Sequence, residues 1–110
     1  MKTLVIHTPK ASDQAGNRSF EDTIESRMGE EFAITRGLYS ELKIGMPLII
    51  LDKRQRKQQQ AIVSRFERGT VAANGIQRYN IFFQDPRPVA YTGDEIKLTR
   101  CGVAVRPFAA

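Results

Sequence analysis

Lysine and arginine gather between two apolar runs in the second half of the chain. Pro47–Leu51 and Ala61–Phe66 are short runs of mostly apolar residues, and the polar segment Asp52–Gln60 joins them. This pattern is typical of two strands joined as a hairpin, with the polar segment at an exposed tip. Cations at such a tip can meet phosphate groups at a small desolvation cost. The tip carries four of them: Lys53, Arg54, Arg56 and Lys57.

Four more arginines follow in or beside the next predicted strands, and aromatic residues accompany them. The additional cations are Arg65, Arg68, Arg78 and Arg87. Antiparallel neighbours can collect such residues on one surface, where an aromatic ring can stack on a base. The rings considered for stacking are Tyr39, Phe82 and Tyr91. The alternative places the aromatic residues in the core and scatters the arginines; we favour it for Tyr79 and Phe83, because Ile81 shares their face.

Charge is unevenly distributed along the chain. The net charge is +5. Residues 1–50 hold six Lys/Arg against seven Asp/Glu, and residues 51–110 hold eleven against five, so the halves carry −1 and +6. A basic half joined to a nearly neutral half indicates an anionic partner. A solvated surface that keeps the protein soluble is the competing interpretation.

Catalytic and metal-binding signatures are sparse in this sequence. With one histidine and one cysteine, a single chain cannot assemble a Cys/His zinc site, and neither a P-loop nor a G-x-G-x-x-G motif occurs. We interpret His7 as structural and Cys101 as a quiet core thiol, and Asp94–Glu95 as unfavourable for a metal because adjacent carboxylates point apart on an extended chain. We therefore expect no cofactor and no metal. Metal-free RNA cleavage, with arginines stabilising phosphate charge, is the remaining enzymatic alternative.

The length of 110 residues predicts one domain over the whole chain, residues 1–110. No apolar run approaches the roughly 20 residues that cross a bilayer, so we expect no membrane association. Met1–His7 is too short for a signal peptide, and a lone cysteine agrees with a reducing compartment. These observations predict a cytoplasmic protein.

The first part of the chain predicts one strand and one or two short helices. Lys2–Thr8 is expected to be an opening strand, with Leu4 and Ile6 on one face and Val5 and His7 on the other. Ser19–Asp22 matches a capping box, and an apolar stripe follows that box into a helix ending near Gly29. The stripe consists of Phe20, Ile24 and Met28. Residues 31–44 are ambiguous and fit a turn followed by a short helix at about 38–42.

A series of closely spaced strands is expected after residue 46. The strands fall at about 47–51, 60–66, 77–83 and 103–106. Turns are expected at Arg68–Gly69 and Asn74–Gly75, and Asp85–Pro88 should end the third of these strands. The pattern predicts an α+β fold: a small, mostly antiparallel, partly open β-barrel with one or two short helices near the N-terminus. An open sheet covered by helices is the main competitor.

Part of this strand pattern resembles the PUA-like superfamily, which includes the PUA, ASCH and EVE domains. The resemblance rests on Leu42–Leu51, the polar loop after it and Ala61–Phe66, and it extends over about residues 37–84. Members commonly carry a Gly-Asp turn before an apolar strand; here Gly45 matches the glycine, whereas Met46–Pro47 replaces the aspartate and its neighbour. The resemblance implies a pseudo-barrel that binds RNA or modified nucleic acid in a cleft.

The catalytic pattern of the ASCH domains does not carry over. G-x-K-x-x-E-x-R would begin at Gly37, but Tyr39 stands at the lysine position and Leu42 at the glutamate position. The absence of tryptophan also argues against the aromatic cages by which some relatives hold methylated bases. No catalytic residue is therefore assigned through the family.

The leading hypothesis is a nucleic-acid-binding module that uses the basic loop and the arginines of a sheet face. RNA or single-stranded DNA is favoured over duplex DNA as the partner. Two other classes stay open: a small enzyme that processes RNA or nucleosides in a PUA-like cleft, and a protein-interaction or oligomeric accessory protein. A small sheet with exposed edges can pair with a second copy, so a homodimer is the default assembly.

Overall fold

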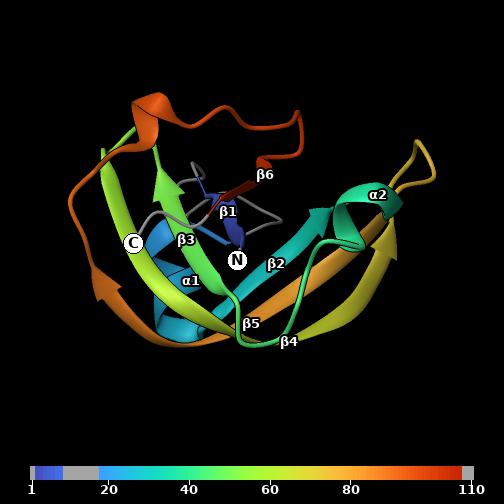
Figure 1. Cartoon of the computed structure of the whole chain (residues 1–110). Coiled ribbons are helices and arrows are strands. Elements are labelled where there is room, and N and C mark those ends of the chain that lie inside the picture. Colours follow the sequence, from blue (N-terminus) through green and yellow to red (C-terminus); the bar gives the residue numbers. More distant parts are fainter. Residues whose placement is uncertain (1, 9–17, 108–110) are drawn as a thin grey trace.

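One curled sheet organises residues 2–8 and 18–107, the part of the chain that the computed structural model describes (Figure 1). Its strands are β1 (Lys2–His7), β2 (Met28–Ala33), β3 (Pro47–Asp52), β4 (Lys57–Val71), β5 (Gln77–Pro88) and β6 (Val103–Pro107). They lie in the order β2-β5-β4-β3-β1-β6 and form an open half-barrel. β1 and β3 pair in parallel, and the other neighbours pair in antiparallel. The predicted small, β-rich, open and mostly antiparallel sheet is confirmed.

The parallel pair β1 and β3 is buried on both faces. Leu4, Ile6, Leu48 and Ile50 point into the main core inside the curl. On the opposite face, Val5 and Leu51 form a second cluster with Ile96 and Ala104. The segment that contains the short 3-10 helix η1 (Gly93–Glu95) covers this second face. This burial explains why both strands read as continuous apolar runs rather than as alternating ones.

The β4–β5 hairpin is longer at its turn end than the sequence suggests. β4 passes through Arg68–Gly69, so the turn predicted there is wrong, whereas the turn predicted at Asn74–Gly75 is confirmed. Gly69 stays inside the strand because the carboxylate of Glu31 fills the place that a Cβ would take. That carboxylate accepts a hydrogen bond from the Thr70 backbone N–H at 3.1 Å, so glycine serves close packing here and not chain reversal.

β5 also continues through the segment expected to end it. Asp85 adopts a left-handed backbone with φ 55°, and the register against β4 shifts nearby, which marks a β-bulge. β2 pairs with β5 only as far as Phe82, so Pro86 and Pro88 lie where β5 has one neighbour. A proline lacks the ladder donor but is tolerated at such an edge.

Helix α1 (Phe20–Ser26) begins where the capping pattern predicts and ends earlier than expected. The Ser19 hydroxyl accepts a hydrogen bond from the Asp22 backbone N–H at 3.1 Å. Arg27 closes the helix in a left-handed conformation, and β2 begins at the next residue. Gly29 is therefore a strand residue, and a Cβ there would meet Ile6 Cδ1 at 2.7 Å.

Residues 28–39 contain a strand and a helix that the sequence pattern does not predict correctly. β2 was not predicted, because the strand is irregular: its register against β5 shifts between Gly29 and Phe32, and Glu31 has a positive φ of 57°. The second helix, α2, is a single turn at Arg36–Tyr39 with Thr35 as its N-cap, and not a helix at 38–42. α2 lies beside the turn end of the β4–β5 hairpin (Figure 1).

Candidate nucleic-acid interface

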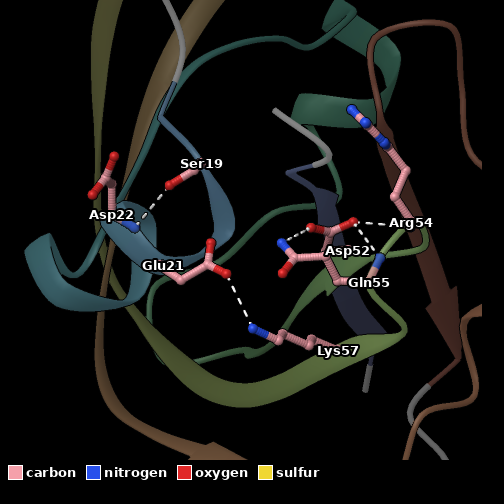
Figure 2. A network of polar contacts seen from close by, with 7 residues as sticks. All are labelled: Ser19, Glu21, Asp22, Asp52, Arg54, Gln55 and Lys57. Carbon is pink, nitrogen blue, oxygen red and sulfur yellow. Dashed lines mark hydrogen bonds and ion pairs between the residues drawn. The ribbon is translucent and has the colours of Figure 1, made fainter. Parts of the chain in front are cut away.

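The β3–β4 turn is built around the buried carboxylate of Asp52. This carboxylate accepts hydrogen bonds from the backbone N–H groups of Arg54 at 2.9 Å and Gln55 at 3.2 Å, and from the Gln55 side chain at 2.6 Å (Figure 2). The Lys53 backbone N–H donates to His7 Nε2 at 3.1 Å. Because β4 already begins at Lys57, the tip is shorter than the predicted loop and is fixed by internal hydrogen bonds.

Arg56 is bound to the segment around η1. Its guanidinium pairs with Asp94 at 2.8 Å and lies over the Tyr91 ring, 4.5 Å from the ring centroid. The Tyr91 hydroxyl donates to the same carboxylate at 3.1 Å. Hydrogen bonds from Arg56 and then from Tyr91 lower the pKa of Asp94. One of the predicted phosphate contacts therefore has an anionic partner within the protein, and one face of one predicted stacking ring is occupied by an arginine.

Two more cations of the tip have internal partners. Lys53 Nζ donates to the backbone carbonyl of Ile96 at 2.7 Å. Lys57 pairs with Glu21 of α1 at 3.1 Å (Figure 2). A hydrogen bond from its own backbone N–H, followed by the one from Lys57, lowers the pKa of Glu21. A phosphate that binds here has to displace these contacts.

Arg65 and Arg78 lie on the outer face of the sheet. Arg65 stands over the Phe82 ring at 3.9 Å from the centroid and pairs with Glu67 at 3.5 Å. Arg78 donates to the Thr70 hydroxyl at 3.1 Å. The Phe82 ring, like that of Tyr91, thus already carries an arginine on one face. Arg87 is exposed and lies opposite Gln60 in the β4–β5 ladder.

Arg68 differs from the other predicted cations, because it points to the inner face. The register places it opposite Tyr79, which belongs to the core. Together with Arg36 of α2 it lines a cavity of about 530 Å³. Tyr39 and Tyr79 form an aromatic wall of this cavity, and the other described walls come from residues 34–35 and 75–77. We call it the Arg36–Arg68 cavity.

The Arg36–Arg68 cavity carries positive charge without a matching negative charge. Its described lining contains no aspartate or glutamate. Within residues 2–8 and 18–107, neither arginine side chain makes an ion pair or hydrogen bond. Tyr39 stacks on Tyr79 with centroids 4.2 Å apart and an interplanar angle of 12°, and its edge meets Phe66. Guanidinium groups beside a tyrosine pair suit an anionic ligand that has a flat ring.

A cavity of similar size beside α1 has a different character. It measures about 580 Å³ and is lined by Glu21 and Glu25 on the helix and by Arg56 and Lys57 on the sheet. These charges balance, and Phe20 contributes apolar surface. Charge therefore favours the Arg36–Arg68 cavity as the place for an anion.

The structure does not bring the eight predicted cations onto one surface. The β3–β4 turn and η1 lie at one end of the curled sheet, and α2 and the β4–β5 turn lie at the opposite end (Figure 1). Arg65 and Arg68 point to opposite faces of β4, as their partners Phe82 and Tyr79 show. Arg36 was missed altogether: it precedes the basic half, and only the tertiary position of α2 brings it beside Arg68.

Comparisons of the chain with protein-family models, with curated proteins and with solved structures find no match. The resemblance to the PUA-like superfamily therefore stays an expectation. Among the residues that the structure describes, no helix has the length and apolar character needed to span a bilayer.

His7 makes the stability of the β3–β4 turn sensitive to pH. Partial burial lowers the pKa of His7 from 6.5; Lys53 lowers it further, whereas Asp52 raises it. The unfolded chain therefore binds the proton more readily, and the stabilisation from neutral His7 is present above about pH 6.5 and lost as the pH falls through the lower folded value. His7→Gln should show a smaller fall in melting temperature between pH 7 and pH 5 than the wild type. Equal falls would contradict this role.

Proposed function

We propose that this chain binds single-stranded nucleic acid, RNA or single-stranded DNA, in the Arg36–Arg68 cavity. The observation that carries the proposal is the pair of arginines without a carboxylate partner in the described chain, at a single cavity. Two like charges that line one cavity, with no carboxylate in its described lining, favour an anionic partner. Guanidinium groups bind phosphate oxygens through paired, charge-assisted hydrogen bonds.

The tyrosine pair supports a nucleic acid over a simple anion. Tyr39 and Tyr79 line the same cavity as the arginines, so a phosphate and the base next to it can be bound together. Stacking of a base on an aromatic side chain contributes about 1–3 kcal/mol and tolerates any base. Bases are free to enter a cavity only in single strands, loops or ends, which favours these over duplex DNA.

The cations of the β3–β4 turn have a secondary place in this proposal. Arg56 and Lys57 are paired with Asp94 and Glu21, so a phosphate has to compete with carboxylates that are already positioned. Arg87 is unpaired within the described chain and exposed, and it can add a contact outside the cavity. The role of the turn in binding stays a prediction. Oligonucleotide titrations of a variant with a neutral turn test it.

Fluorescence anisotropy with labelled oligonucleotides tests the function. Single-stranded RNA, single-stranded DNA and duplex DNA of one sequence are titrated at several salt concentrations. We expect the single strands to bind more tightly than the duplex. A plot of log affinity against log salt concentration should fall with a slope at least as steep as about −1.4. This value corresponds to two phosphate contacts at roughly −0.7 each. Absence of binding to every probe at low salt would reject the function, and tighter binding to the duplex would reject base stacking in the cavity.

A further inference from the structure

The charge of the Arg36–Arg68 cavity matches a terminal phosphate of a nucleic acid better than an internal one. This comparison rests on the proposed function. An internal phosphodiester carries one negative charge. A terminal phosphomonoester carries about −1.5 to −2 at pH 7, because its second pKa is about 6. Two arginines line the cavity, and its described lining holds no carboxylate. A terminal phosphate neutralises both guanidinium groups, whereas an internal one leaves a positive charge uncompensated.

The hydrogen-bonding groups of the cavity also favour a terminal phosphate. Arginine side chains only donate, and a tyrosine hydroxyl can also donate. In the described chain, the hydroxyls of Tyr39 and Tyr79 have no hydrogen-bond partner. Neither hydroxyl oxygen is fully buried, so both are accessible to a ligand. A phosphomonoester offers three non-bridging oxygens as acceptors, and an internal diester offers two. The donors of this cavity thus fit the group that has more acceptors.

The walls of the cavity suit a strand end. They come from three segments: α2 with the residues before it, Arg68 on β4, and the turn into β5 up to Tyr79. The volume of about 530 Å³ is in the range of pockets that bury one small ligand, and so suits one nucleotide and not a run of several. A strand that enters with its end places the terminal phosphate at the arginines and the first base against the tyrosines.

We infer that the Arg36–Arg68 cavity recognises the phosphorylated end of a single-stranded nucleic acid. Arg36 and Arg68 bind the terminal phosphomonoester, and Tyr39 with Tyr79 forms the wall on which the terminal base stacks. No bond is formed or broken in this recognition.

Three oligonucleotides of one sequence, labelled at an internal position, test the inference by fluorescence anisotropy. One carries a 5′-phosphate, one a 3′-phosphate and one a hydroxyl at both ends. We expect one phosphorylated form to bind about tenfold more tightly than the unphosphorylated strand, as for one added charge-assisted contact. Equal affinities of all three would overturn end recognition while leaving the proposed function in place, and no binding by any of them would overturn both.

Matched arginine variants locate the effect. Arg36→Gln and Arg68→Gln should each remove most of the preference for the phosphorylated strand. Arg100→Gln, which changes an exposed arginine outside the cavity lining, should retain it. Preference that survives in both cavity variants would contradict the assignment. A free nucleoside monophosphate that binds as tightly as the phosphorylated strand would also contradict it, because the cavity would then select mononucleotides.

Discussion

Replacing Arg36 and Arg68 together by glutamine is expected to weaken binding of a single-stranded oligonucleotide by about a hundredfold, because each variant removes one charge-assisted phosphate contact worth roughly tenfold. The slope of log affinity against log salt should become shallower by about 1.4, or roughly 0.7 for each lost contact. Both side chains lie on the rim of the fold and are exposed, so the melting temperature should change little. Anisotropy titrations and thermal melts followed by circular dichroism measure these effects.

Neutralising the β3–β4 turn is the matched comparison for this result. The variant that replaces Lys53, Arg54, Arg56 and Lys57 by glutamine removes more charge than the cavity variant. It should nevertheless cost less affinity, since Lys53, Arg56 and Lys57 already have partners within the protein. A larger loss in the turn variant would place the interface at the turn, where the sequence alone locates it.

Ile81→Ala should lower the free energy of unfolding by about 2–5 kcal/mol, much more than the same truncation of an exposed isoleucine. Ile81 is fully buried on β5, where it faces Gly29 of β2 and Phe66 of β4 in the ladder. Truncation leaves a cavity where three strands meet. Ile62→Ala is the control, because the same atoms are removed from a side chain that is 39% exposed. Urea denaturation measures both, and similar losses in the two variants would contradict the predicted core.

Much of the fold could be predicted, because several segments carry complete local signals. The strands at 47–51 and 103–106, the Ser19 cap and the Asn74–Gly75 turn each depend on residues close together in the sequence. The errors lie where distant residues decide the outcome. The sequence predicts a turn at Gly69, because it does not show that the carboxylate of Glu31 occupies the space beside this glycine. β2 is similarly hidden, because its bulge interrupts the period-two pattern.

The candidate site was less predictable than the fold. The sequence identifies the cations, but it does not show which of them are already paired. Asp94 and Glu21 are 38 and 36 positions away from their partners Arg56 and Lys57, so no local pattern links them. Arg68 was identified through the basic composition of its segment, whereas Arg36 carries no such signal. Pairing within the fold therefore separates cations that are available to a ligand from cations that hold the structure together.

Mapping of an oligonucleotide onto the protein by NMR tests the central claim most directly. A ¹⁵N-labelled sample is titrated with a single-stranded oligonucleotide, and changes in the backbone amide shifts are assigned to residues. Binding in the Arg36–Arg68 cavity predicts that the largest changes fall in residues 34–39, at Arg68 and in residues 75–79, with small changes in residues 53–57. Shifts confined to residues 53–57, or spread evenly over the surface, would contradict the cavity as the nucleic-acid site.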